Sequence, residues 1–287
     1  MKVKKATLYG YIFFSPFFLV YFMFRLIPFA QSVWMTLHQW EVLTPPQFIG
    51  LENFHTLFTT ARFWTSLWNT IQFTIITVPP LVIFGFIIAV LVNGRIFGKS
   101  FFRFAFYLPN ILSISVVCLT WLLMLNRSHG IVNVFLKNFG IQPIAWVSDP
   151  NFAMLAVGMT TIWWSFGFNF LVYLSSLQQI PDSVYEAAQI DGAGWLQRLI
   201  RVTLPILSRT HAVVIVLQIL ASLQIFGQVY IMTGGGPGGR TRVLIQYVYE
   251  EGFRFFNMGY AQAIAFVFFI FMTGVAYLQI RLMETKE

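Results

Sequence analysis

Residues 180–205 read IPDSVYEAAQIDGAGWLQRLIRVTLP, and they separate two long uncharged stretches of the chain. Pro181 is tolerated in the first turn of a helix, and Asp182 and Ser183 are favoured there as caps. This pattern predicts a short helix over residues 184–189. Two small alanines beside one carboxylate on such a helix suit insertion into a groove of a partner protein.

Two glycines end the predicted helix. Gly192 and Gly194 favour the backbone conformations that close a helical C-terminus. Residues 195–202 are expected to continue as an amphipathic segment along a membrane surface, and Pro205 opens the next apolar stretch. The short helix is therefore predicted to stand in a loop over residues 175–208.

The chain around this loop has too few charges for a soluble surface. It has 287 residues, of which 57% are hydrophobic and 10% are charged, whereas soluble domains carry about 25% charged residues. Its 33 Phe and 9 Trp exclude a disordered chain, because they provide too much apolar surface to stay solvated. The composition indicates a protein that crosses the membrane several times.

Six parts of the chain are long and apolar enough to cross a bilayer, which takes about 20 residues in a helix. Helices are predicted rather than barrel strands, because no segment alternates strictly between apolar and polar residues. The expected fold is an all-α membrane protein, one transmembrane domain over residues 1–287. The predicted spans are residues 8–33, 67–92, 104–125, 151–174, 209–232 and 258–281.

The first predicted span follows three lysines and could be taken for a secretory signal peptide. Its apolar stretch is longer than the ~7–15 residues of a signal core, so we expect an uncleaved anchor. Arg25 interrupts this span. We expect it to snorkel to the outer boundary of the membrane, with contact to an anion or a gate as the alternative.

The basic residues predict the orientation, since they gather on the cytoplasmic side of membrane proteins. Six spans put both termini on one side, and that side holds most of the 18 Lys and Arg residues: Lys2, Lys4, Lys5, Arg95, Lys99, Arg103, Arg198, Arg201, Arg209, Arg281 and Lys286. The other side holds Arg62, Arg127, Lys137, Arg240, Arg242 and Arg254. Both termini are therefore predicted to be cytoplasmic. This distribution also explains the net charge of +8 without nucleic-acid binding.

The positions of the acidic, cysteine and histidine residues disfavour two further classes of function, ion-driven carriers and metalloproteins. All ten acidic residues, up to Glu287, lie outside the predicted spans. Proton- and sodium-driven carriers usually need carboxylates inside the membrane, so this class is disfavoured. Cys118 is the single cysteine, and the four histidines have no metal-binding spacing, so we expect no metal site and no cofactor.

At this point the sequence resembles the inner-membrane permease subunits of binding-protein-dependent ABC transporters. Their signature is E-A-A, three residues, G, nine residues and I-x-L-P. The matching residues here are Glu186, Ala187, Ala188, Gly192, Val202, Leu204 and Pro205, with Val202 in place of the usual isoleucine. Residues 233–237 read TGGGP after the fifth predicted span, as in the carbohydrate-uptake branch.

The resemblance implies partners and a mechanism. The chain would pair with a second, different permease subunit, two ATPase subunits and an extracytoplasmic sugar-binding protein, in a bacterial or archaeal inner membrane. ATP would drive alternating access through the short loop helix. The residues implied to contact the ATPase are Glu186, Ala187, Ala188, Asp191, Gly192 and Gly194. The chain lacks the G-x-x-x-x-G-K-[ST] motif, so we expect it to transmit work and not to be an enzyme.

A sugar site is predicted within the fourth and fifth spans, because sugars need hydrogen bonds and aromatic stacking. One helical stripe and its neighbours supply both: Thr161, Trp164, Ser165, Phe168 and Asn169 in span four, with Ser222, Gln224 and Gln228 in span five. The span-four stripe and Ser222 also match positions that line the sugar site of maltose-type members. The alternative for each residue is packing against another helix.

The glycine-rich run after span five is expected to be a flexible extracytoplasmic turn. We predict that the binding protein docks on Gly234, Gly235, Gly236 and Pro237. A phosphate-binding loop is disfavoured because the run lacks the required Lys and Ser or Thr.

These patterns favour one function and leave others open. The favoured function is the permease subunit of an ATP-driven importer of an oligosaccharide or glycoside. The same machinery could carry glycerol phosphate or another polyol, although the predicted spans offer no basic residue except Arg25 for a phosphate. A passive channel would not need the loop helix, and no nucleophile–base pair supports a lipid-modifying enzyme.

Overall fold

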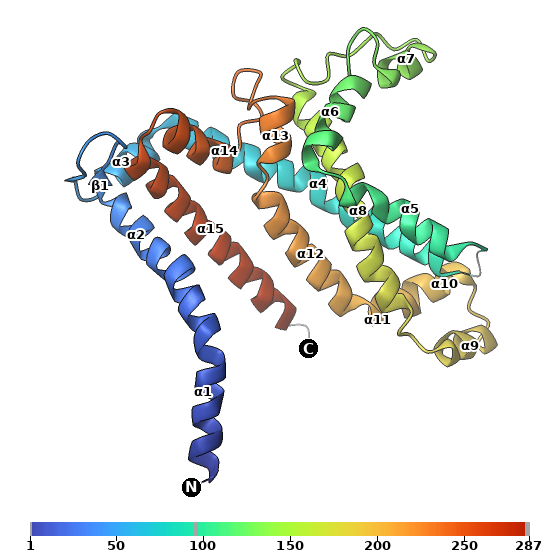
Figure 1. The fold of residues 1–287 in the computed structure, drawn as a ribbon. Coiled ribbons are helices and arrows are strands. Elements are labelled where there is room, and N and C mark those ends of the chain that lie inside the picture. Colours follow the sequence, from blue (N-terminus) through green and yellow to red (C-terminus); the bar gives the residue numbers. More distant parts are fainter. Residues whose placement is uncertain (1, 95–96, 285–287) are drawn as a thin grey trace. The chain divides into compact units, whose positions relative to one another are not determined.

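The computed structural model describes residues 2–94 and 97–284, and Figure 1 shows its helices. Helices dominate, and the only strands in the described residues are two residues long, which confirms the predicted all-α membrane protein. The chain folds as two compact units, residues 1–63 with 247–271 and residues 64–246 with 272–287. Arg95, Lys286 and Glu287, which entered the charge distribution, lie outside the described residues.

Four helices among the described residues are long and apolar enough to cross a membrane: Tyr9–Thr36, Ala61–Asn93, Ala153–Leu177 and Met258–Met283. Two helix pairs reach that length only as bent spans. Lys99–Ile111 and Ile114–Met124 meet at 95°, and Trp195–Ile206 and Ser208–Leu223 meet at 68°. The described chain thus provides four to six candidate spans, and the arrangement of six spans stays a prediction.

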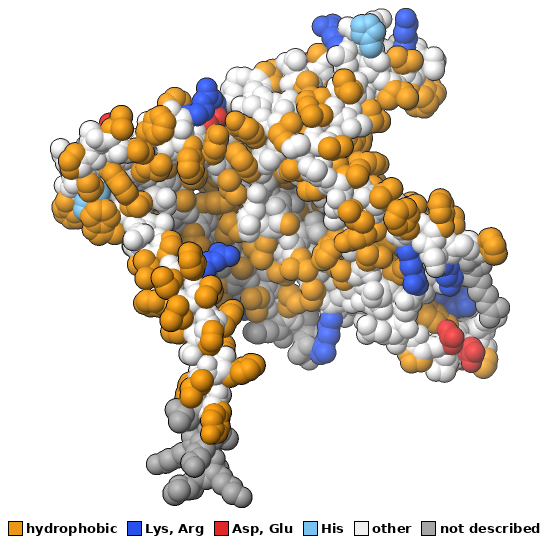
Figure 2. Space-filling model, viewed as in Figure 1, with side chains coloured by type: hydrophobic (Ala, Val, Ile, Leu, Met, Phe, Trp, Pro, Cys, Tyr) orange, Lys and Arg blue, Asp and Glu red, His pale blue; other side chains and the backbone are white. Residues whose placement is uncertain are grey.

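The first unit begins with a long, continuous apolar helical segment. The helices α1 (Lys2–Tyr21) and α2 (Ile27–Thr36) join through the π-helical segment η1 (Phe22–Leu26), which contains Arg25. Phenylalanine and tyrosine side chains are exposed over residues 9–21 of α1, and Figure 2 shows hydrophobic side chains along this part of the helix. A helix that is apolar on every side suits contact with lipid.

A short hairpin follows the C-terminal end of α2. Strands β1 (His38–Gln39) and β2 (Gln47–Phe48) pair antiparallel, and α3 (Glu52–Thr59) follows. The buried Asn53 of α3 donates from Nδ2 to the carbonyl oxygens of Thr36 (2.8 Å) and His38 (3.0 Å). The bond to Thr36 O satisfies a carbonyl group that the end of α2 leaves without a helical partner.

A cluster of charged side chains links separate segments of the first unit. It joins Arg62, near the start of α4 (Ala61–Asn93), to η3 (Glu250–Arg254), which lies between α14 (Leu244–Tyr249) and α15 (Met258–Glu284). The Arg62 guanidinium pairs with Glu250 and Glu251 and lies 4.8 Å from the centre of the Tyr247 ring. Burial, followed by the hydrogen bond with Tyr260, raises the pKa of Tyr247. Buried charges require such pairing.

The second unit is built around α8. It contains most of α4, the start of α14 and the C-terminal part of α15. Its other elements are α5 (Lys99–Ile111), α6 (Ile114–Met124), α7 (Ile131–Lys137), α8 (Ala153–Leu177), α9 (Asp182–Ile190), α10 (Trp195–Arg198), η2 (Leu199–Thr203), α11 (Leu204–Ile206), α12 (Ser208–Leu223) and α13 (Gly227–Met232). The first half of α8 packs with α4, α6 and α13, and its second half packs with α4 and α12. Gly167 of α8 lies directly against the α5 backbone at Phe106, where a side chain would collide with the carbonyl oxygen.

Two of the predicted spans differ from the structure because each contains a break. Residues 104–125 are divided at Leu112 and Ser113, and residues 209–232 are interrupted after Leu223, with helix resuming at Gly227. A β carbon at Gly227 would lie 2.6 Å from Ile114 Cδ1, so glycine lets α13 approach α6. By contrast, α4 continues through Pro79 and Pro80 without interruption.

Candidate functional site

The predicted loop helix is present as α9, which starts after Pro181 and has Asp182 in its first turn. A carboxylate there is favoured by the helix dipole. At the other end, the Gly192 N–H donates to Gln189 O (3.0 Å) and the Ala193 N–H donates to Ala188 O (2.9 Å). This pair of bonds is a Schellman motif, and the φ of +77° at Gly192 is the left-handed conformation that it requires.

One side of α9 is attached to the second unit. Val184 and Tyr185 pack against the buried cluster formed by α4, α8 and α12. The Tyr185 hydroxyl is 3.2 Å from Oγ1 of Thr203, which is buried in η2. The helix is therefore fixed on one face before any partner binds.

The other side of α9 and the segment after it are exposed. Glu186, Ala187, Asp191, Gly192 and Gly194 lie at the surface, and Ala188 is half-buried. Ile190 is 86% exposed, and Trp195 and Leu196 are also exposed. Ile190 lies outside the candidate spans, and a large exposed apolar side chain there suits contact with a partner protein.

Gly194 begins the next element. Its N–H donates to Gln197 Oε1 (3.0 Å), and this hydrogen bond caps the N-terminus of α10. Its φ of −66° is ordinary for any residue. The two glycines of the predicted loop therefore have different roles, and only Gly192 needs the left-handed conformation.

In α8, Asn169 bridges three helices. It is fully buried, donates from Nδ2 to Leu81 O of α4 (3.1 Å), and accepts from Gln218 Nε2 of α12 (2.8 Å). A β carbon at Gly85 would lie 2.6 Å from Asn169 Cβ, so α4 and α8 are in close contact there. This geometry matches the alternative of helix packing. Sequence reasoning missed Gln218, although it lies four residues before Ser222 on the same face of α12.

Three other predicted substrate residues also point into the second unit. Thr161 is buried and its hydroxyl donates to Val157 O (2.9 Å), within α8. The Ser222 hydroxyl is 3.2 Å from Thr77 Oγ1 of α4, and both residues are buried. Gln228 of α13 is buried as well. These side chains reach a substrate only if the helices around them separate.

The remaining predicted substrate residues reach the surface of the chain. Phe168 and Gln224 are exposed, and Trp164 and Ser165 are half-buried. The Trp164 indole donates from Nε1 to Leu112 O (3.1 Å), in the break between α5 and α6. The structure thus divides the eight predicted residues into four at the surface and four inside the unit.

The glycine-rich run is held in place by hydrogen bonds and differs from the flexible turn that we expected. The Thr241 hydroxyl is 2.7 Å from Thr233 Oγ1 and donates to Gly236 O (2.6 Å). Asn69 Nδ2 of α4 donates to Gly239 O and Arg242 O. Gly234 is exposed, Gly235 is buried, and Gly236 and Pro237 are half-buried. A fixed loop presents a preformed surface.

Comparison with known proteins decides the family. Residues 58–284 match the family described as the binding-protein-dependent transport system inner membrane component. The chain belongs to this family. The match covers α9 and the other candidate site residues, so the resemblance drawn from residues 186–205 is confirmed.

Relatives of this permease family are similar over most of their length. The chain is 34% identical to the probable ABC transporter permease protein YurN of Bacillus subtilis over 99% of both chains. It is 36% identical to the sulfoquinovosyl glycerol transport system permease protein SmoG of Agrobacterium fabrum, over 85% of this chain and 79% of that one. It is 32% identical to the trehalose/maltose transport system permease protein MalF of Thermococcus litoralis, over 90% of this chain and 86% of that one.

Two solved structures share the permease fold. One is a bacterial ABC transporter involved in the import of the acidic polysaccharide alginate, 22% identical over 99% of both chains with a TM-score of 0.82. The other is the bacterial alginate ABC transporter in complex with an alginate pentasaccharide-bound periplasmic protein, 24% identical over 98% of this chain and 94% of that chain with a TM-score of 0.81. At these identities the likeness establishes the fold alone.

Proposed function

We propose that this permease is the membrane-spanning subunit of an ATP-driven importer of an oligosaccharide or glycoside. Its family membership carries the proposal, and the trehalose/maltose and sulfoquinovosyl glycerol systems of its relatives support a sugar substrate. A sugar-binding protein outside the membrane would deliver the substrate. The test is a thermal-shift screen of the cognate binding protein against sugars, followed by uptake of the stabilising sugar in cells with and without this chain.

In this proposal α9 is the coupling helix, docked in a cleft of an ATPase subunit. Its exposed face and its fixed C-terminal end support this role. A second permease subunit would dock its own loop helix on a second ATPase subunit. ATP binding would then move both helices, and the two permeases would rock between inward- and outward-open states.

The exposure of the predicted substrate residues suggests two roles. Trp164, Ser165, Phe168 and Gln224 would contact the sugar at the junction with the second permease. Thr161, Asn169, Ser222 and Gln228 would hold the helices that carry these side chains. Polar residues commonly bridge helices within membranes, which supports this division.

Trp164→Ala is expected to lower uptake about tenfold, because losing an aromatic contact costs about 1–2 kcal/mol. The sugar affinity of the separate binding protein should not change. Uptake of labelled sugar at saturating binding protein measures the effect.

The matched variant is Trp164→Phe, which keeps a ring but removes the hydrogen bond to Leu112 O. It should retain at least about one third of the uptake, a loss within roughly 0.7 kcal/mol. Equal loss in both variants would show that the indole stabilises the helix break and does not stack on sugar.

We further propose that both termini and α9 are cytoplasmic, in an inner membrane. The test uses single cysteines in a Cys118→Ser background. Arg240→Cys, at an exposed position of the glycine-rich loop, should react with an impermeant reagent in intact cells. Gly194→Cys, in an open position after α9, should react only after the membrane is permeabilised. The reverse pattern would invert the topology.

The glycine-rich loop would then face the binding protein. Its fixed hydrogen bonds support docking by a preformed surface, because little conformational entropy is lost when a rigid loop binds. The exposed Gly234 and the half-buried Pro237 would contribute to this contact.

A further inference from the structure

The segment between α6 and α8, residues 126–148, forms a compact structure that we call the α7 lobe. Asn133 of α7 is buried at its centre. It donates from Nδ2 to Ile144 O (2.9 Å), and its Oδ1 accepts from the Ile144 N–H (3.1 Å) and from Trp146 Nε1 (3.1 Å). Asn126 Oδ1 accepts a hydrogen bond from the Ser128 N–H (3.0 Å). The lobe is therefore folded before it meets a ligand.

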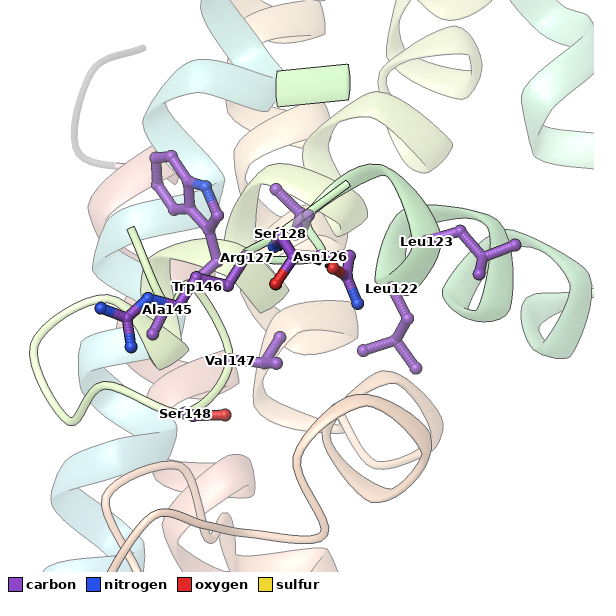
Figure 3. Close-up of a pocket in the computed structure, with 10 residues that line it drawn as sticks. Leu122, Leu123, Asn126, Arg127, Ser128, Ala145, Trp146, Val147 and Ser148 are labelled. Atoms are coloured by element: carbon purple, nitrogen blue, oxygen red, sulfur yellow. Dashed lines mark hydrogen bonds between the residues drawn. The ribbon is translucent and has the colours of Figure 1, made fainter. Parts of the chain in front are cut away.

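A cavity of about 500 Å³ lies between the end of α6 and residues 145–148 (Figure 3). Its lining has two chemical characters. The apolar part consists of Leu122, Leu123, Leu125, Ala145, Trp146 and Val147. The polar part includes Asn126, Arg127, Ser128 and Ser148. Such a cavity fits an amphiphile that has a charged group at one end and hydrocarbon at the other.

The apolar part of the cavity continues onto the outside of α6. Leu123 is 75% exposed, and with Val116 and Leu119 it forms an exposed stripe along that helix. Within the described part of the chain, more than half of the surface of each of these three residues stays exposed. A hydrocarbon chain that enters the cavity at Leu123 can therefore extend along α6 without crossing polar surface.

The outer face of α7 is also apolar. Ile131, Val134 and Phe135 are exposed on it, and the exposed Phe139 follows. The rings of Phe135 and Phe139 are in contact, with centroids 5.2 Å apart. A short amphipathic helix with such a face binds in the plane of a membrane surface.

The charges of the lobe all have one sign. It carries Arg127 and Lys137, as well as His129, and the sequence has no acidic residue between Glu52 and Asp149. Figure 2 shows basic and histidine side chains beside hydrophobic ones at the end of the lobe that carries α7. This charge is complementary to a phosphate group.

We propose that the α7 lobe binds an anionic phospholipid. Arg127 and Ser128 would hold the phosphate, an acyl chain would lie against the leucines of the cavity and along the α6 stripe, and α7 would lie in the membrane interface. An acidic soluble protein would match the charge of the lobe. It would not match an apolar wall that continues onto a membrane helix, and for that reason lipid is favoured.

The test measures lipid selectivity of the intact transporter complex by native mass spectrometry. The complex is incubated with equal amounts of phosphatidylglycerol and phosphatidylcholine that have the same acyl chains. The wild-type complex should retain phosphatidylglycerol preferentially. Arg127→Gln should lower the ratio of the two retained lipids about fivefold, as expected for about 1 kcal/mol per basic residue near an anionic lipid.

The matched control is Arg240→Gln, which removes an exposed arginine from the glycine-rich loop and should leave the ratio unchanged. Leu123→Ala should lower retention of both lipids, because it shortens the apolar wall. Equal retention of both lipids by the wild type would overturn the proposal. So would displacement of phosphatidylglycerol by millimolar inorganic phosphate, or an Arg127→Gln effect on binding-protein association with an unchanged lipid ratio.

Discussion

A transporter with Gly192→Val is expected to lose at least 90% of its ATP-driven uptake while its permease still inserts in the membrane. Gly192 has a φ of +77°, and the left-handed conformation costs a residue with a β carbon about 1–2 kcal/mol, with β-branched residues disfavoured most. Valine would break the two backbone bonds that end α9. Helix α9 would then extend or fray where the ATPase contact is proposed.

Labelled-sugar uptake and an immunoblot of washed membranes measure this effect together. Gly192→Asn should keep most of the uptake, because asparagine tolerates the left-handed conformation. Gly194→Ala should also keep it, since its φ is −66° and the space around it is open. Normal uptake with Gly192→Val, or an equal loss with Gly194→Ala, would contradict the assignment of α9 as the coupling helix.

Gly167→Leu is expected to prevent folding of the second unit. A β carbon at Gly167 would collide with the Phe106 carbonyl oxygen and lie 3.0 Å from Tyr107 Cα. These are backbone atoms of α5, so no side-chain rotation relieves the collision and the helices must separate. Overpacking against side chains costs about 1–3 kcal/mol, and a collision with a helix backbone should exceed that range.

The matched control is Gly274→Leu in α15, where no atom lies within 4 Å of an added β carbon. Fluorescence-detected size-exclusion chromatography of solubilised membranes gives the amount of folded protein. The Gly274 variant should give a wild-type peak and the Gly167 variant should give almost none. Equal yields from both variants would contradict the close packing of α5 and α8.

The features that sequence predicted best depend on neighbouring residues. The loop helix was predictable because Pro181 and Gly192 mark its two ends within one short stretch of sequence, and the structure places α9 at Asp182–Ile190. The apolar spans were recognisable for a similar reason, since the absence of charge over 20 residues is a local property.

The features that sequence reasoning missed depend on distant residues or on weak local signals. Asn169 is bonded to Leu81 O and Gln218, 88 and 49 positions away, so its packing role could not be inferred from the polarity of one stripe. The break at Leu112 follows Pro109 by three residues, and α4 continues through two prolines. Proline alone therefore did not distinguish a broken span from a continuous one.

The course of α4 through Pro79 and Pro80 has a mechanical consequence. Prolines have no N–H, so the carbonyl groups of Ile75 and Ile76 lack the helical bonds that would normally stiffen this turn. Just before it, the hydroxyls of Thr70, Thr74 and Thr77 each donate to the carbonyl four residues earlier, which favours bending. The flexural stiffness of α4 is consequently lowest over residues 70–80. A load applied to either end of this helix should produce curvature there, while the segments on both sides move as rigid rods.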